Sequence, residues 1–425
     1  MNTQRDPLLR NLERHKANLQ NGLMIYQTQR IQHGLNLMTE KKEQEEEKTV
    51  YRPLSYVDGE IRLLKSTPMQ PNEPLKFTMM NVALAEAPLY VALSYYWGDP
   101  HRTASVEVDD VDMQITINLE AALRRLVAED VEFVWADALC INQKDIFEKS
   151  LQIPRMAAIF NKASVVAVWL GDELDIDESA RAELRNGTSP SLGEDFCLSS
   201  QPTFKQILRR PYWRRVWVVQ ELAMASHIDV YCGSDRIPWD SIDTTCKCCQ
   251  SRSFINTRGL PVDEHVFQFT MLREVRKNIS RGKAMSLLDV LHRTRHCLAT
   301  NPRDKIFGVL GLASDARRFI AEPSYKGSFS DIFTAFATQL LSHNILDFIY
   351  LRSANRRVDK ALPSWVPDWT DLDDHVARRQ FDYLIIHSKS IQIPETETLR
   401  REPKAIGFLS SATNGLENIL ATESM

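Results

Sequence analysis

An acidic residue lies in an otherwise apolar stretch near the middle of the chain. From Val216 to Ala225 the sequence reads VWVVQELAMA, in which Gln220 and Glu221 are the only polar residues. In a helix, the residues three and four positions from Glu221 are Trp217, Val218, Met224 and Ala225. None of them carries a charge, and an apolar setting raises the pKa of a carboxyl group, as in many catalytic acids and bases. The alternative is a buried structural ion pair between Glu221 and a nearby arginine.

More polar and aromatic residues follow three apolar runs that we expect to be strands. Ser94, Tyr95 and Trp97 come at or after the end of YVALSYYW, Asp137 follows VEFVWA, and the Gly-Asp pair at 171–172 follows SVVAVWL. In parallel α/β sheets, ligands bind beyond the carboxyl ends of the strands. We therefore predict that these side chains converge on one crevice, which Glu221 joins from its helix.

Each of these candidates also has a purely structural interpretation. Trp217 could form an aromatic wall for a ligand ring, but a helical tryptophan is more often part of the core. Asp137 could bind ribose hydroxyl groups or cap the helix that follows it. Ser94 and Tyr95 could contact a substrate, although serine after a strand commonly forms a turn, and Trp97 could serve packing alone.

Strands and helices alternate between residues 90 and 233, which predicts an α/β fold with a doubly wound, parallel sheet. Two strands, EIRLLKS and LKFTMMNVAL, precede this region, and Asn118 is the expected N-cap of the helix after the ASVEVDDVDMQITI hairpin. We divide the chain into a helical or disordered arm at 1–50, an α/β domain at 51–235 and a mainly helical extension at 236–425 with a poorly ordered tail.

Composition excludes several functional classes. The net charge of −4 and the pI near 6.2 give no reason to expect nucleic acid as a partner. No apolar run is long enough to span a membrane, and seven scattered cysteines favour a reducing, cytoplasmic location. The GxGxxG pattern of dinucleotide-binding dehydrogenases and the GxxxxGK[ST] pattern of P-loop proteins are both absent, so the sequence does not predict either class. The cysteines at 246, 248 and 249 match no usual zinc spacing, so we expect free thiols and no metal.

Three segments in this order resemble the signature blocks of the fungal heterokaryon-incompatibility (HET) domain. They are YVALSYYWGD, VWADALCINQKD and YWRRVWVVQEL, and they span residues 90–222. NPRDKIFGVLGLA and LPSWVPDWT resemble stretches that commonly follow this domain. The HET domain is in turn similar to the TIR domain, so the resemblance implies a TIR-like, flavodoxin-like fold for residues 51–235.

The same resemblance implies a function. HET proteins act in fungal non-self recognition and programmed cell death, and many TIR domains cleave NAD⁺ with a glutamate in a W-C-x-x-E-L context. WVVQEL places Glu221 at the catalytic position and has Val218 where that motif has cysteine. NAD⁺ would be a substrate, and no cofactor is expected. The resemblance also implies self-association on activation, and other incompatibility proteins as partners. The alternative is a non-enzymatic interaction module in the same signalling.

Overall fold

The computed structural model describes residues 50–68, 73–186, 201–253, 264–320, 323, 325, 327–351 and 362–370. The chain divides into two units, Met1–Arg52 and Pro53–Met425, and every element given below belongs to the second unit. The predicted arm, except for Val50, and the predicted C-terminal tail lie outside the described residues. The predicted division at residue 235 stays a prediction.

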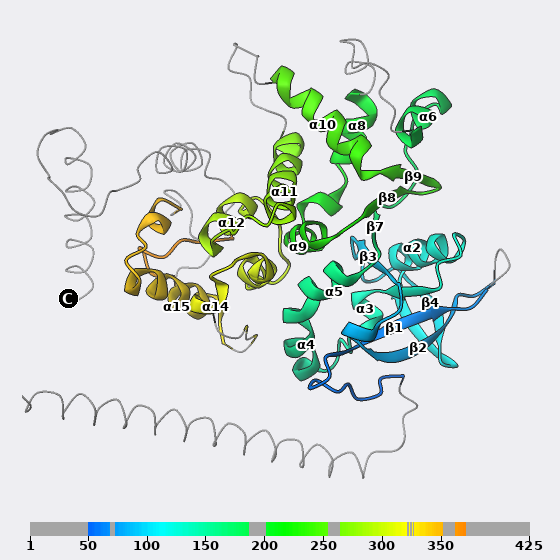
Figure 1. Ribbon diagram of the computed structural model, residues 1–425, viewed down its shortest axis with the longest axis horizontal. Helices are drawn as coiled ribbons and strands as arrows, with labels where there is room; N and C mark the ends of the chain where they lie inside the picture. The colour runs from blue at the N-terminus through cyan, green and yellow to red at the C-terminus, as the bar shows by residue number, and fades with distance from the viewer. Residues whose placement is uncertain are drawn as a thin grey trace, which may run out of the picture. The chain divides into compact units, whose positions relative to one another are not determined.

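A nine-stranded mixed sheet with the order β5-β4-β2-β1-β6-β3-β7-β8-β9 forms the centre of the second unit (Figure 1). Its strands are β1 (Glu60–Ser66), β2 (Lys76–Ala83), β3 (Val91–Tyr95), β4 (Thr103–Val108), β5 (Val111–Thr116), β6 (Phe133–Trp135), β7 (Val165–Trp169), β8 (Ile228–Cys232) and β9 (Asp235–Pro238). The five strands expected from the apolar and alternating runs are confirmed, and β4 and β5 confirm the expected hairpin. The sheet continues past residue 235 because β9 pairs with β8 as far as Pro238.

The part of the sheet that carries the candidate site is parallel. β6, β3, β7 and β8 are consecutive neighbours and run in the same direction. Numbered among themselves in chain order, they stand as 2-1-3-4, so the order reverses between β3 and β7. Antiparallel pairs flank them, β1 with β2 and β6 on one side and β8 with β9 on the other. The predicted α/β class is confirmed, but the sheet is mixed rather than wholly parallel.

A tight turn joins β4 to β5, and a capped helix follows directly. β4 and β5 are joined by the two-residue turn Asp109-Asp110, and both residues have positive φ values of 49° and 59°. Aspartate tolerates this left-handed conformation better than most residues, and it suits a tight hairpin. α2 (Ile117–Val127) follows at once, with the Thr116 side chain accepting from the Leu119 amide as N-cap. The expectation that Asn118 caps this helix is therefore wrong.

Helices fill the connections between the parallel strands. They are α2, α3 (Asp137–Cys140), α4 (Ile146–Gln152), α5 (Met156–Lys162), α6 (Glu178–Asn186), α8 (Gln201–Leu208) and α9 (Val216–Met224). Short 3₁₀ turns occupy Leu84–Glu86, Ile153–Arg155 and Pro211–Arg214. Pro154 and Pro211 lie in the second and third of these turns, since proline removes a helical hydrogen bond.

α9, which carries Glu221, is buried on nearly all sides. It packs against α5, against α11 (Glu264–Ser280) and against the 3₁₀ turn Leu310–Leu312. The guanidinium of Arg276 on α11 donates to the Leu222 and Ala225 carbonyls, which satisfies the open end of the helix. An apolar helix covered in this way explains why its sequence lacks an amphipathic pattern.

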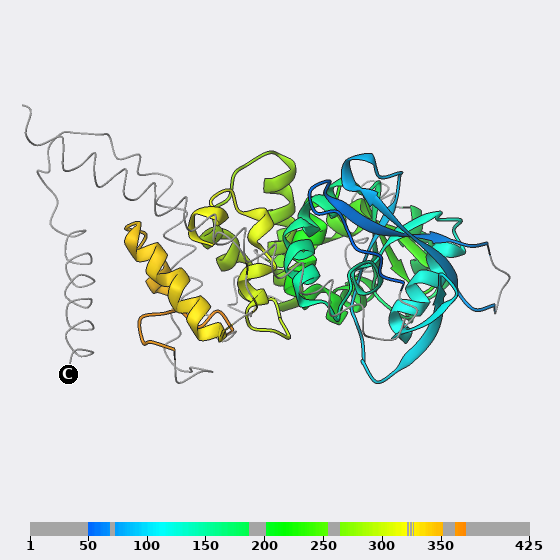
Figure 2. The ribbon, with the colours of Figure 1, turned by 90° about the horizontal axis from the view of Figure 1, so that it is seen from below.

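The described residues after Pro238 are mainly helical, as predicted. They form α10 (Trp239–Ser253), α11, α12 (Leu287–Thr294), α13 (Asp304–Phe307), α14 (Ala316–Phe319), α15 (Phe329–Ser342) and 3₁₀ turns at Leu310–Leu312 and Asp347–Leu351. Ser286 caps α12, and Ser328 forms a capping box with Asp331 at α15. Figure 1 shows α12 and α15 on the side of α9 away from β1 and β2, and Figure 2 shows the same separation from below. None of the helices described is both long and apolar enough to cross a membrane.

Candidate functional site

Ser94, Tyr212 and Glu221 form a buried hydrogen-bonded chain. Ser94 lies near the end of β3, Tyr212 in the 3₁₀ turn Pro211–Arg214, and Glu221 in the second turn of α9. The Ser94 hydroxyl donates to Glu221 Oε2 and lies 2.6 Å from the Tyr212 hydroxyl oxygen. The three residues are 1%, 1% and 4% exposed. Water therefore does not compete for these bonds in this structure.

Burial changes the acidity of Glu221. It raises the pKa of this carboxyl group from 4.5 to about 7, while the nearby Arg215 guanidinium and the Ser94 hydrogen bond act in the opposite direction. The Asp137 carboxylate adds a smaller increase. A carboxyl group with this pKa exists in both protonation states near neutral pH, as general acid–base catalysis requires.

Glu221 makes no ion pair with any residue that the structure describes. Arg215 is the arginine that lowers the pKa of Glu221. Its Nη1 donates to the backbone carbonyl of Tyr95 and not to the Glu221 carboxylate. The structural interpretation of Glu221 as half of a buried salt bridge therefore lacks its partner in the described part of the chain. A buried pair of that kind does exist elsewhere, between Arg62 and Glu148 with Nη1 to Oε1 at 2.5 Å.

Tyr95, Asp137 and Trp97 lie beside the buried chain and lead from it to the surface. Desolvation and the neighbouring Asp137 carboxylate raise the pKa of the buried Tyr95 hydroxyl well above 10. Asp137 accepts from its neighbour's amide, Ala138 N, at 2.8 Å and from Trp97 Nε1 at 3.2 Å. Trp97 itself is 42% exposed. The structure thus brings Ser94, Tyr95, Asp137 and Glu221 together and places Trp97 at the edge of the group.

Asn118 links the two strands at which the sheet order reverses. Its Nδ2 donates to the Tyr96 carbonyl after β3, and its Oδ1 accepts from Trp169 Nε1 at the end of β7, at 2.9 Å. Arg210 donates to the Asp172 and Glu173 carbonyls after β7. Both side chains fix the backbone at the carboxyl edge of the sheet.

Trp217 has a different environment from the other candidates. Its Nε1 donates to Asp304 Oδ2 at 3.2 Å, and Asp304 Oδ1 accepts from the Tyr325 hydroxyl at 2.7 Å. Desolvation raises the pKa of the Asp304 carboxyl group. Trp217 therefore connects α9 to the downstream NPRDKIFGVLGLA segment, and its predicted role in substrate binding stays a prediction.

Tyr212 and the contact of Arg215 with Tyr95 were not predicted from the sequence. Tyr212 precedes Glu221 by nine residues and lies outside the helix, so a search by helical spacing does not reach it. Its place inside the YWRRVWVVQEL block was the one available signal.

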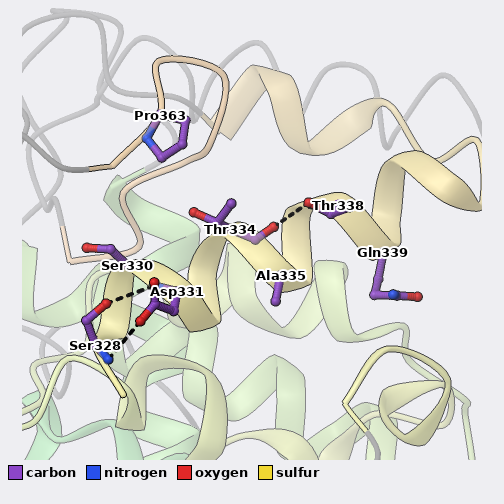
Figure 3. Close-up of a pocket in the computed structure, with 8 residues that line it drawn as sticks. All are labelled: Ser328, Ser330, Asp331, Thr334, Ala335, Thr338, Gln339 and Pro363. Carbon is purple, nitrogen blue, oxygen red and sulfur yellow. Dashed lines mark hydrogen bonds between the residues drawn. The ribbon is translucent and has the colours of Figure 1, made fainter.

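A surface pocket of about 610 Å³ lies along α15, formed by downstream residues. Its lining consists of Ser328, Ser330, Asp331, Thr334, Ala335, Thr338, Gln339 and Pro363 (Figure 3). The Asp331 carboxylate and the Ser328 hydroxyl are already engaged in the helix cap, and the Thr338 hydroxyl donates to the Thr334 carbonyl at 2.8 Å. This lining offers hydroxyl groups for binding but no acid–base pair for catalysis.

Metal-ligating side chains do not cluster among the residues that the structure describes. Among the described residues, no group of three or more His, Cys, Asp or Glu side chains could hold a metal ion. Four buried cysteines, Cys140, Cys232, Cys246 and Cys297, are free thiols. The side chains of the cysteines at 248 and 249 lie outside the described set.

Comparison with known proteins identifies the region that contains the site. Residues 90–221 match the family model described as "Heterokaryon incompatibility protein (HET)". The chain contains a HET domain. All of the predicted site residues, and Tyr212, lie within the matched residues of this domain, and Glu221 is the last of them.

A curated relative extends the similarity beyond the HET domain. "Heterokaryon incompatibility protein 6, OR allele" of Neurospora crassa is 24% identical over 423 aligned positions, which cover 78% of this chain and 61% of the relative. The chain thus spans about three fifths of the length of that relative. No solved structure matches the chain.

Proposed function

We propose that this chain is an effector of heterokaryon incompatibility, and that Glu221 is the catalytic carboxylate of a TIR-like site that cleaves NAD⁺. The role in incompatibility is proposed from the HET domain and from the name of the N. crassa relative. The observation that supports the chemistry is the buried Glu221 carboxyl group, which bonds to Ser94 and has no ion-pair partner among the described residues. A carboxylate in that position destabilises the fold when it is ionised, so a chemical role accounts for it better than a stabilising one.

The position of the group in the sheet supports the same proposal. The parallel strand order 2-1-3-4 is the beginning of the flavodoxin-like order, in which ligands bind at the carboxyl edge where the order reverses. Here that point lies between β3 and β7, and Ser94 and Tyr95 are the last two residues of β3. Trp97 and Asp137 would contact the substrate from the adjoining loop and helix.

The proposed reaction breaks the bond between ribose C1′ and the nicotinamide nitrogen. The bonding electron pair leaves with nicotinamide, water adds its oxygen to C1′, and ADP-ribose and one proton are the other products. A carboxylate beside the ribose stabilises the positive charge that develops there. Because only ionised Glu221 does this, the rate should rise with pH through the pKa of about 7. Loss of cellular NAD⁺ would then cause the cell death that the family resemblance implies.

The site is closed in this structure, and this has a consequence for regulation. Ser94, Tyr95 and Glu221 are all buried, so a nucleotide reaches them only after the residues around Trp97 move. We propose that self-association, or contact with another incompatibility protein in the cytoplasm, drives that movement. Neither nucleic acid nor a cofactor has a place in this scheme.

The same burial favours a second candidate function. If the polar group serves only to fix the fold, the HET domain is a non-enzymatic interaction module that transmits the incompatibility signal. In that case Glu221 and Ser94 position α9 against β3, and the exposed surface around Trp97 transmits the signal by contact with a partner.

Induced expression in a fungal host distinguishes the two candidates. For an NAD⁺-cleaving effector, cellular NAD⁺ falls before viability, and Glu221→Gln abolishes both effects at equal protein level. Glu86→Gln, which makes the same change at an exposed position, is the matched control and should behave like wild type. Loss of viability at constant NAD⁺, equally in wild type and Glu221→Gln, would support the interaction module instead.

A further inference from the structure

Tyr212 is the member of the buried chain for which neither the sequence nor the family comparison suggests a role. Its hydroxyl oxygen lies 2.6 Å from Ser94 Oγ, and its ring packs edge-on against Trp213 with centroids 4.9 Å apart. The side chain is 1% exposed. Burial keeps water away from the Tyr212 hydroxyl group, and the packed ring holds this group next to Ser94 Oγ.

The number of available protons fixes the direction of the hydrogen bonds. Serine has a single hydroxyl proton, and Ser94 donates it to Glu221 Oε2. Tyr212 must then be the donor in the bond to Ser94 Oγ. Both hydroxyl protons are used, and the chain ends on the carboxylate. The arrangement therefore fits the ionised form of Glu221.

Protonation of Glu221 disturbs this arrangement. Three protons are then shared among the three side chains, while the two bonds between them use only two. The described residues provide no further acceptor to the Tyr212 hydroxyl, so one polar hydrogen is left unsatisfied in a buried place. Bonds that end on an ionised carboxylate are also stronger than neutral ones.

We propose that Tyr212 is a positioning residue of the HET-domain site, which orients the Ser94 hydroxyl toward Glu221 and so favours the ionised carboxylate. It opposes the effect of burial, which favours the protonated form. Among the described residues, the other charged or titratable groups that interact electrostatically with Ser94, Tyr212 and Glu221 or lie beside them are Arg215, Asp137 and Tyr95. Its importance for catalysis rests on the proposed function, but its effect on Glu221 does not.

The protonation of Glu221 can be followed directly by infrared difference spectroscopy of the purified full chain. The carboxyl C=O band that disappears in Glu221→Gln belongs to Glu221, and its pH midpoint gives the pKa of this group. Tyr212→Phe removes one hydroxyl group and should lower the ratio of ionised to protonated Glu221 about threefold at a given pH. Ser94→Ala removes the direct donor and should lower the ratio about tenfold.

Tyr90→Phe is the matched control, since Tyr90 is also 1% exposed but donates to the Ile159 carbonyl at 2.5 Å. It should leave the midpoint unchanged. A midpoint in Tyr212→Phe that equals wild type, or that moves to lower pH, overturns the proposal. If Tyr212→Phe does not fold, an unchanged midpoint in Ser94→Ala overturns it as well.

Activity separates this inference from the proposed function. If wild type cleaves NAD⁺, the pH profile of cleavage in Tyr212→Phe should move with the infrared midpoint. A shifted midpoint without any cleavage supports the role of Tyr212 and contradicts the proposed enzyme. Cleavage with an unmoved midpoint supports the enzyme and contradicts the role of Tyr212.

Discussion

Replacing Glu221 with glutamine should stabilise the protein at neutral and alkaline pH. Burial raises the pKa of Glu221 from 4.5 to about 7 in the folded state. The folded chain therefore binds the proton more tightly than the unfolded chain. The stabilisation is fully present below pH 4.5, decreases as the pH rises, and is lost once the pH has passed about 7.

The size of the effect follows from the same difference. Each pKa step of one corresponds to about 1.4 kcal/mol, so ionised Glu221 costs about 3 kcal/mol of unfolding free energy. Glutamine does not ionise, yet its side-chain oxygen can still accept from Ser94. The advantage of Glu221→Gln over wild type should therefore grow by about 3 kcal/mol between about pH 4.5 and about pH 8.

Urea unfolding followed by tryptophan fluorescence at several pH values measures this difference. Glu86→Gln, at an exposed position, is the control for removing one carboxylate from the surface. The reasoning is refuted if the difference between Glu221→Gln and wild type is the same at every pH. A difference of opposite sign, with wild type gaining stability as the pH rises, would mean that Glu221 has an ion-pair partner after all.

Three further substitutions test contacts and backbone conformation in the fold by thermal or urea denaturation. Gly311→Ala should cost about 1–3 kcal/mol, because a Cβ there would lie 2.7 Å from Ala157 Cβ, which cannot rotate away, and 2.5 Å from Gln220 Oε1; an unchanged melting temperature would contradict these close contacts. Arg62→Met should cost about 3–5 kcal/mol by leaving Glu148 buried and unpaired; a loss below about 1 kcal/mol would mean that the pair is not buried in solution. Asp110→Gly should stabilise the β4–β5 turn by up to about 1 kcal/mol, since its φ is 59°; destabilisation would argue against that backbone conformation.

Much of the HET domain could be predicted because its strands are short apolar runs bounded by turn residues. The runs that end at Tyr95, Trp135 and Trp169 became the parallel strands of the site. Since the carboxyl ends of such strands meet at one edge, the convergence of Ser94, Tyr95 and Asp137 could be predicted as well. The antiparallel pairs at the two sides of these strands could not be predicted. The alternation of apolar and polar residues in a strand does not indicate in which direction that strand joins the sheet.

The details that were missed are contacts between segments distant in sequence. Tyr212 reaches Ser94 across 118 residues, and Trp217 reaches Asp304 across 87. Helical and strand periodicity describe only neighbours within one element, so they give no information on such pairs. The cap of α2 was misassigned for a related reason. Asn118 is a good N-cap residue, but its amide is used to link Tyr96 and Trp169 instead.

The most direct test of the proposed role of Glu221 is nicotinamide release from NAD⁺ by the purified chain at high protein concentration. Wild type should release nicotinamide at a rate that rises with pH through about 7, and Glu221→Gln should release none. No release from folded, self-associated wild type, or equal release by Glu221→Gln, would contradict the assignment of Glu221 as the catalytic carboxylate.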